Sequence, residues 1–192
     1  MIQIVIVGVG GQGTLLASKI LGHIAVHSGL DTKVSEVHGM SQRGGSVITH
    51  VRIAEQGEKV HAPLVEQGGA DVVLAFERLE ALRALPYLKK GGTMILNDQK
   101  ILPMPVITGA AEYPEDALST IRASANTIAV DALSVAMECG SVRAANVVML
   151  GVLSRLLPFA PEVYEDAIRA LIRPQFVELN LAAFAAGRAL TD

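Results

Sequence analysis

The pattern of hydrophobic positions begins with a strand. Residues 2–7 are β-branched apart from Gln3 and run directly into Gly8, which predicts a strand buried on both faces of a parallel sheet. Residues 12–28 then show the period of an amphipathic helix, which Gly29 ends. Two adjacent apolar rows mark the buried side of this helix: Leu16, Ile20 and Ile24, and Ala17, Leu21 and Ala25.

The alternation of strand and helix continues through the middle of the chain. Residues 46–53 alternate between apolar and polar positions, and a turn at 55–58 predicts a short hairpin with 59–62. Further predicted strands are 32–36, 71–76, 93–96, 106–108 and 127–130, and the helices among them are 77–85 and 115–123. This order predicts an α/β fold with a doubly wound, mostly parallel, Rossmann-like sheet and a β-hairpin excursion.

The last third of the chain is different in kind. Helical periods cover 131–138, 144–157, 161–172 and 174–189, and two of these helices have Pro at or near the first turn, where its missing N–H costs nothing. We therefore expect a helical C-terminal third. No internal repeat, low-complexity tract or flexible linker divides the sequence, so we expect residues 1–192 to form a single domain.

Composition narrows the function classes. Hydrophobic residues make up 51% of the 192 residues and charged residues 18%, which excludes a disordered tail protein. The 16 basic and 19 acidic residues leave a formal net charge of -3, and the chain has 4 Phe, 3 Tyr and no Trp. Because it offers neither a positive field nor an aromatic platform, we expect no nucleic-acid partner.

The number of cysteines limits which metal sites and disulfides the chain can form, and the lengths of its apolar runs bear on whether it is secreted or inserted in a membrane. Cys139 is the only cysteine, so the chain alone cannot close a disulfide or ligate a zinc ion or an iron–sulfur cluster. The first residues already read as a strand, which leaves no room for a secretory signal. The apolar run 144–153 contains Asn146 and is far shorter than the roughly 20 residues that span a bilayer. We therefore expect a soluble, cytoplasmic protein with no membrane partner.

A glycine-rich turn separates the first strand from the first helix. It comprises Gly8, Gly10, Gly11, Gln12 and Gly13 in a G-x-G-x-x-G pattern. Such glycines let the backbone turn tightly, approach a phosphate or another chain, and point helix N–H groups outward. Glu36 ends the second predicted strand, near where an acidic residue binds the adenine ribose in nicotinamide enzymes. A free-standing NAD(P)- or flavin-binding Rossmann protein is one interpretation, and glycines that only allow helix and strand to pack closely are the other.

A second glycine-rich segment follows the second predicted strand. Its candidate binding residues are Gly39, Ser41, Gln42, Arg43, Gly44 and Gly45. At the carboxyl end of a strand, this loop is expected beside the glycine turn, in the crevice where open α/β sheets bind ligands. Arg43 could hold a phosphate or carboxylate, whereas a solvated surface turn is the plainer interpretation.

Other residues are weaker candidates. His23 and His27 have the i, i+4 spacing of a metal pair, but they lie opposite the apolar rows and indicate a solvated helix face. Cys139 has no neighbouring His and is expected to be structural. Glu77 and Asp131 each follow a predicted strand, where capping the next helix is their common role. The sequence therefore predicts no catalytic residue and no metal ligand.

Taken together, the two glycine segments resemble the gamma-type domain of 2-oxoacid:ferredoxin oxidoreductases. Within that family the likeness is greatest to the small (beta) subunit of the indolepyruvate branch. It covers nearly the whole chain, with the characteristic segments at 4–16, 34–52, 70–86, 143–151 and 174–187.

The resemblance implies an accessory subunit. Enzymes of this family oxidatively decarboxylate a 2-oxoacid on thiamine diphosphate, pass electrons through 4Fe-4S clusters to ferredoxin, and transfer the acyl group to coenzyme A. This chain lacks the thiamine diphosphate motif and has one cysteine. Thiamine diphosphate, its Mg ion and the clusters are therefore expected on a larger partner subunit, through which ferredoxin is also reached. The two glycine segments are left as a candidate surface for coenzyme A or for the partner.

Overall fold

The computed structural model describes residues 1–38 and 45–190. Its strands are β1 (Ile2–Val9), β2 (Thr32–His38), β3 (Ser46–Ile53), β4 (Ala70–Ala75), β5 (Leu88–Asn97) and β6 (Asn126–Val130). Its α-helices are α1 (Thr14–His27), α2 (Arg78–Ala84), α3 (Met104–Ile107), α4 (Ala117–Ser124), α5 (Ala132–Glu138), α6 (Ala145–Ser154), α7 (Pro161–Leu171) and α8 (Val177–Ala189). Short 3-10 helices are η1 (Leu85–Tyr87), η2 (Val142–Ala144) and η3 (Pro174–Phe176).

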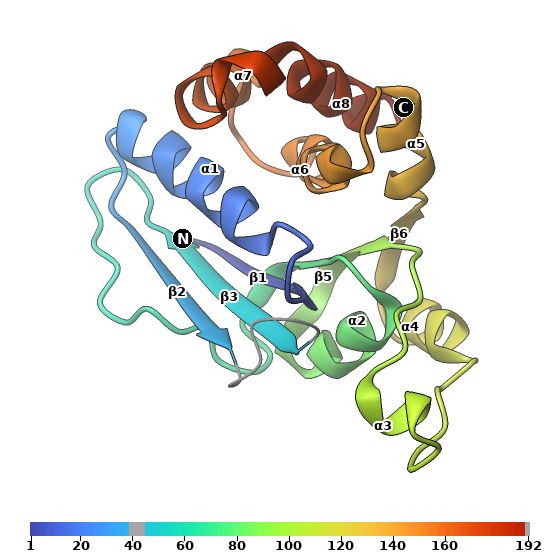
Figure 1. Cartoon of the computed structure of the whole chain (residues 1–192). Helices are drawn as coiled ribbons and strands as arrows, with labels where there is room; N and C mark the ends of the chain where they lie inside the picture. Colours follow the sequence, from blue (N-terminus) through green and yellow to red (C-terminus); the bar gives the residue numbers. More distant parts are fainter. Residues whose placement is uncertain (39–44, 191–192) are drawn as a thin grey trace.

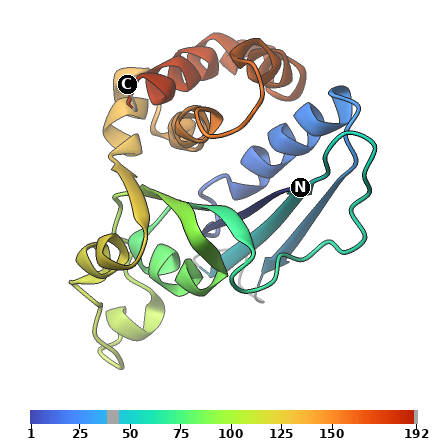
Figure 2. The same ribbon diagram turned by 180° about the vertical axis from the view of Figure 1, so that it is seen from behind.

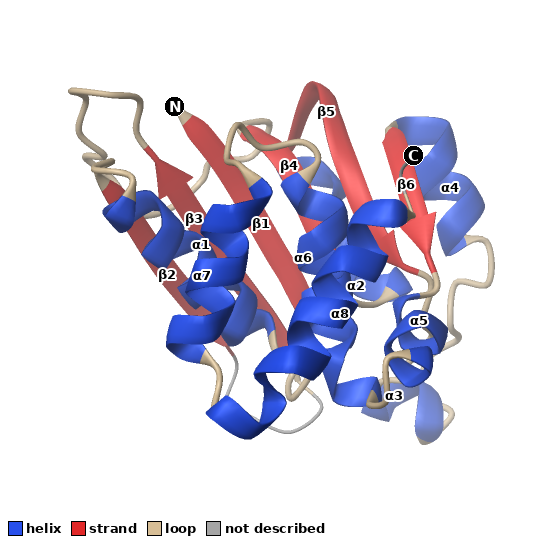
Figure 3. Ribbon diagram, turned by 90° about the horizontal axis from the view of Figure 1, so that it is seen from above, coloured by secondary structure: helices blue, strands red, loops and turns tan. Residues whose placement is uncertain are grey.

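The described strands form one mixed sheet in the order β2-β3-β1-β4-β5-β6. The pairs β1-β4, β4-β5 and β5-β6 are parallel, whereas β3 is antiparallel to both β2 and β1. Figure 3 shows the strands side by side, with β2 and β6 at the two edges. The predicted α/β fold with a mostly parallel sheet is therefore confirmed.

Helices cover both faces of this sheet. Successive side chains of β1 point to opposite faces, as the pleat requires. Ile4 and Ile6 belong to the core with α1, α6, α7 and α8, whereas Val5 and Val7 belong to the core with α2 and α4. Figure 1 shows these two helix layers above and below the strands. The consecutive apolar residues at 4–7 of the first strand thus reflect burial on two sides.

The predicted hairpin between 46–53 and 59–62 is wrong. Strand β3 instead pairs along one edge with β2, from Thr32 opposite Ile53, and along the other with β1, from Ile2 opposite Ile53. Since both edges of β3 carry a full ladder of hydrogen bonds, no edge remains for 59–62. Residues 54–69 run as a loop beside β2 and β3, as Figure 2 shows from behind.

The predicted strand at 106–108 is also wrong. Residues 104–107 form the short helix α3, in which the Val106 N–H donates to the Pro103 carbonyl at 3.0 Å. Pro103 and Pro105 have no N–H to donate to a ladder, so this segment folds on local bonds instead of joining the sheet. Beyond it, β6 and the C-terminal helices lie where the sequence places them.

Two glycines set the packing of the C-terminal helices. A Cβ at Gly151 of α6 would lie 2.3 Å from the Phe184 carbonyl oxygen of α8, and a Cβ at Gly187 of α8 would lie 2.0 Å from the Val148 carbonyl oxygen. The two helix backbones can therefore cross this closely only where both positions are glycine. Among the described helices, none has the length and apolarity required to cross a membrane.

Candidate functional site

The glycine turn lies at the carboxyl edge of the parallel strands, between β1 and α1. Gly11 has φ +99 and Gly13 has φ +85, a region that favours glycine. Gly8 is constrained by space instead, because its Cβ would lie 2.9 Å from Gln12 Oε1 and 3.2 Å from Phe76 Cβ. A Cβ at Gly13 would also lie 2.3 Å from Asn146 Nδ2, so the glycine pattern corresponds to two left-handed positions, Gly11 and Gly13, and two close approaches, at Gly8 and Gly13.

The Gln12 side chain holds the ends of three strands together. The Val9 N–H at the end of β1 donates to Gln12 Oε1 at 2.7 Å. Gln12 Nε2 donates to the Phe76 carbonyl after β4 at 2.9 Å and to Gln99 Oε1 after β5 at 3.0 Å. Both ends of this amide are therefore bonded inside the fold, and Gln12 acts on the turn by fixing its shape.

Sequence reasoning missed two amides behind the turn, Asn97 and Gln99. The buried Asn97 donates to Gln99 Oε1 at 3.2 Å and accepts from the Ala132 N–H at 3.0 Å. The sequence signal was a polar pair at the end of β5, in the crevice position where α/β proteins place functional groups. Together with Gln12 these side chains form an amide network across the carboxyl edge.

The second glycine segment meets the turn at its described end. The Gly10 N–H donates to the Gly45 carbonyl oxygen at 2.9 Å, so the two glycine segments touch at the carboxyl edge, as expected. The candidate residues Gly39, Ser41, Gln42, Arg43 and Gly44 lie outside the described residues.

Two cavities flank the glycine turn. The first has a volume of about 370 Å³, and its polar lining comprises Gln12, Asn97, Gln99, Arg143 and Asn146 beside the backbone of Gly11 and Gly13. The second, of about 350 Å³, is lined by Gly10, Gly11, Gly13, Thr14, Leu15, Glu36 and Val47. Glu36, the acidic residue of the nicotinamide interpretation, thus lines a cavity shared with the turn, but its strand β2 is separated from β1 by β3.

Arg143 and Asn146 complete the first cavity from the C-terminal helices. Arg143 belongs to η2, where its N–H donates to the Ser141 hydroxyl at 3.3 Å, and Asn146 is the second residue of α6. The nearly buried Asn146 amide donates to the Gly13 carbonyl at 3.3 Å. The signal for Asn146 was a polar residue inside an otherwise apolar run, three positions after Arg143.

The first cavity has the chemistry of a binding site. A guanidinium, side-chain amides and backbone groups at the start of α1 are suited to hydrogen bonds with a phosphate or carboxylate. Among the described residues that line it, none is an Asp, Glu, His, Lys or Cys. The cavity can therefore bind and orient an anion, while it lacks a side chain of the kinds that usually act as general base or nucleophile.

Glu77 and Asp131 cap helices, as predicted. The Asp131 carboxylate accepts from the Ser134 hydroxyl at 2.6 Å and from its N–H at 3.0 Å, and these bonds lower the pKa of Asp131. Glu77, which is 1% exposed, accepts from the Glu80 N–H at 3.0 Å at the start of α2. It also accepts from the Tyr113 hydroxyl at 2.7 Å; burial first, and then this bond, raises the pKa of Tyr113 above its ordinary value.

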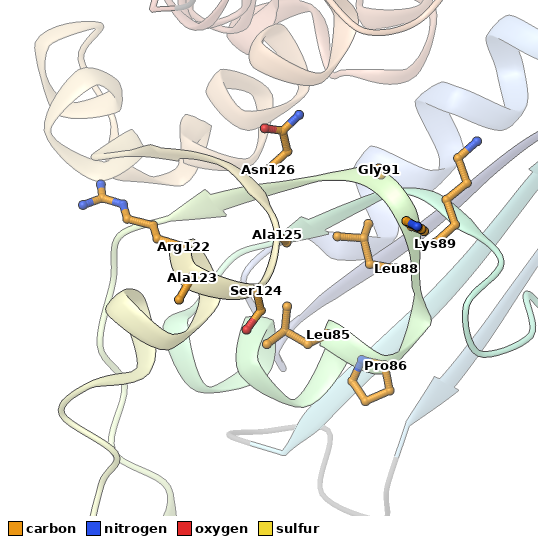
Figure 4. A pocket seen from close by; sticks show the side chains of 12 residues that line it. Leu85, Pro86, Leu88, Lys89, Gly91, Arg122, Ala123, Ser124, Ala125 and Asn126 are labelled. Atoms are coloured by element: carbon orange, nitrogen blue, oxygen red, sulfur yellow. The ribbon is translucent and has the colours of Figure 1, made fainter.

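A larger cavity, of about 700 Å³, lies at the opposite edge of the sheet, where β5 and β6 begin. Figure 4 shows Lys89 and Arg122 on two sides of it. Arg122 stands in the last turn of α4, where a cation is stabilised by the helix dipole, and Lys89 pairs with Asp71. These charges thus have structural partners, and no described residue of the two glycine segments lines this groove.

Comparison with known proteins supports the resemblance. Residues 3–190 match the family model described as "Pyruvate ferredoxin/flavodoxin oxidoreductase". The chain is 44% identical over 191 residues to "Indolepyruvate oxidoreductase subunit IorB" of Archaeoglobus fulgidus, covering 97% of this chain and 93% of that relative.

Solved structures show the same fold. The gamma subunit of a keto/oxoacid ferredoxin oxidoreductase from Geobacter sulfurreducens is 25% identical, with a TM-score of 0.74 and coverage of 99% of this chain and 98% of that one. The 2-oxoglutarate:ferredoxin oxidoreductase from Magnetococcus marinus is 21% identical with a TM-score of 0.76, and the match covers 98% of this chain but 30% of that longer chain. The chain therefore belongs to the pyruvate ferredoxin/flavodoxin oxidoreductase family.

Proposed function

We propose that the chain is the small (beta) subunit of an indolepyruvate:ferredoxin oxidoreductase. The observation that carries this proposal is the 44% identity to an indolepyruvate oxidoreductase subunit over nearly the full length of both proteins. In this proposal residues 1–192 act as one gamma-type domain in the cytoplasm and support coenzyme A-dependent oxidative decarboxylation of aryl 2-oxoacids.

The larger partner subunit carries the redox chemistry in this proposal. Cys139 is the only cysteine, and a 4Fe-4S cluster requires several thiolates, so this chain does not fit that group. The glycine-turn cavity likewise lacks carboxylates that would hold Mg²⁺ for thiamine diphosphate among its described lining residues. Thiamine diphosphate, Mg and the clusters are therefore assigned to the partner, and ferredoxin is reduced there.

The first cavity beside the glycine turn is proposed to contact coenzyme A. Its volume of about 370 Å³ suits part of a nucleotide-sized ligand rather than the whole molecule. Arg143 and the Gln99 amide would bind phosphate oxygens, while Gln12 and Asn146 fix the backbone of the turn. The chain thereby orients the acyl acceptor without taking part in bond making.

Reconstitution with the purified larger subunit tests both parts of this proposal. The isolated chain is expected to be inactive, and the mixture to reduce ferredoxin in a reaction that needs indolepyruvate and coenzyme A. Full activity of the larger subunit alone would refute the subunit role.

The coenzyme A contact is tested with Arg143→Ala in the assembled enzyme. We expect KM for coenzyme A to rise about three- to tenfold with little change in kcat, because a partly solvated charge-assisted hydrogen bond contributes ~1 kcal/mol. Arg173→Ala, an exposed arginine before η3, is the matched control and is expected to leave KM unchanged. If KM for coenzyme A is unchanged in Arg143→Ala and the complex is intact, the proposal that coenzyme A binds in this cavity is refuted.

A second candidate function rests on Glu36. Glu36 lines the same cavity as Gly10, Gly11 and Gly13, so a carboxylate lies beside the glycine turn even though β3 separates its strand β2 from β1. Calorimetric titration of the purified chain with NAD(H), NADP(H) and FAD distinguishes the two functions. Binding would favour a free-standing Rossmann protein, and absence of binding at millimolar ligand would eliminate that alternative.

A further inference from the structure

Residues 101–111, here called the apolar projection, form an exposed segment without a single charged side chain. Its sequence is Ile-Leu-Pro-Met-Pro-Val-Ile-Thr-Gly-Ala-Ala, in a chain of which 18% is charged. Leu102, Met104 and Ile107 are 44%, 66% and 61% exposed. Figure 1 shows α3, the helical turn within this segment, standing away from the body of the protein.

The apolar projection is held firmly at its base. The buried Glu77 carboxylate binds the chain on both sides of the projection, because the Ile101 N–H at 3.1 Å and the hydroxyl of Tyr113, two residues beyond the projection, at 2.7 Å donate to the same oxygen, Oε1. Lys100 lies over the Tyr113 ring, with its Nζ 4.6 Å from the ring centroid. A buried charged acceptor with two donors from one loop is a strong tether, so the projection has a defined position.

Its tip is held by its own backbone. The Ala110 N–H donates to the Pro105 carbonyl at 2.8 Å, and the Thr108 hydroxyl donates to the Met104 carbonyl at 3.0 Å. With much of the polar backbone bonded internally, the outer surface consists mainly of Leu, Met, Ile and Pro side chains. The fold therefore presents an apolar surface that loses little conformational entropy on binding.

The projection adjoins the candidate site. A cavity of about 260 Å³ is lined on one side by Pro103 and Met104, and on the other by Val9 and Gly45 at the glycine segments. A protein seated on the projection would therefore also lie against the carboxyl edge of the sheet, where the amide network and the glycine turn are found.

We propose that the apolar projection is the element by which this subunit docks into an apolar groove of the larger subunit. The inference rests on the proposed function and names the surface that the partner covers. Exposed apolar groups clustered on one element mark protein interfaces, and the absence of charge matches the depletion of charged residues from interface cores. In the Magnetococcus marinus enzyme the same fold makes up 30% of a longer chain, so there it is joined to further protein.

The test compares two double variants of the full chain for binding to the purified larger subunit by calorimetry. Met104→Asp with Ile107→Asp places two charges on the projection, and we expect an at least about tenfold weaker Kd. The matched control is Val26→Asp with Leu64→Asp, which alters side chains that are 61% and 49% exposed, away from the carboxyl edge. It is expected to bind as the unaltered chain does. All four side chains are exposed, so both variants are expected to fold, which circular dichroism checks.

The outcomes separate this inference from the proposed function. If the unaltered chain binds the larger subunit and Met104→Asp with Ile107→Asp binds equally well, the docking role is refuted while the subunit role stands. If the unaltered chain forms a dimer that this variant abolishes, the occupant is a second copy and the proposal is again refuted. Failure of the unaltered chain to bind at all would overturn both.

Discussion

Replacing Gly13 with alanine tests the physical account of the glycine turn. Two separate penalties are expected at this position. The φ of +85 places alanine in the left-handed region, which costs ~1–2 kcal/mol for an L residue. In addition, the new Cβ would lie 2.3 Å from Asn146 Nδ2, and displacing a packed side chain costs ~1–3 kcal/mol. Together they predict that the free energy of unfolding falls by roughly 2–5 kcal/mol.

The two penalties can be measured separately. Gly29→Ala carries only the first, because Gly29 has φ +72 and a Cβ there meets nothing within 4 Å. We expect it to lower the free energy of unfolding by ~1–2 kcal/mol. In an Asn146→Ala background the amide is gone and only the Asn146 Cβ, at 3.2 Å, remains near the new methyl group. In this background Gly13→Ala should lower the free energy of unfolding by nearly the same amount as Gly29→Ala does in the unaltered chain.

Urea unfolding of the four proteins in this cycle, with Gly29→Ala alongside, is the assay. The expected result is a coupling free energy of at least ~1 kcal/mol between positions 13 and 146. If Gly13→Ala has the same effect as Gly29→Ala in both backgrounds, the close approach of Asn146 does not constrain the turn, and the reasoning is refuted.

Three further predictions follow from the described contacts. Gly187→Ala should lower the free energy of unfolding by ~3 kcal/mol or more, since its Cβ would lie 2.0 Å from the Val148 carbonyl oxygen; an unchanged midpoint in urea would contradict this. Tyr113→Phe should cost ~1.5–3 kcal/mol in thermal unfolding, because it removes a hydrogen bond to the buried Glu77 carboxylate. Burial lowers the pKa of His50 in the folded protein, so the unfolded chain binds its proton first and stability falls as the pH drops below about 6.5. His50→Asn should weaken that dependence, and an identical pH profile of unfolding would argue against it.

Local sequence determined most of the elements. The apolar run that forms β1, the helical rows of α1 and the four C-terminal helical periods all depend on neighbours within a few residues, and the structure confirms them. Capping by Glu77 and Asp131 was likewise predicted from position alone. The period of apolar residues is sufficient here because each of these elements buries a continuous face.

The two wrong strand predictions concern which segments pair with one another in the sheet. The pattern of 46–53 predicted a strand but not its neighbours, and the adjacent turn suggested 59–62. The structure places it between β1 and β2 instead. Which edges pair depends on the whole sheet, and apolar alternation carries no information about the partner. The strand predicted at 106–108 was wrong for a related reason, because Pro103 and Pro105 just before it have no N–H to donate to a ladder.

In the candidate site, too, some features were determined by the sequence and others only by the tertiary structure. The sequence by itself determined that the chain belongs with gamma-type subunits and that a glycine turn with Gly11 and Gly13 follows the first strand, which contains Gly8. Only the tertiary structure brought Gln99 to Gln12 across 87 positions, and Asn146 to Gly13 across 133. Such contacts depend on how the helices pack across the sheet, which no local sequence pattern indicates. These contacts decide which side chains line the cavity beside the turn.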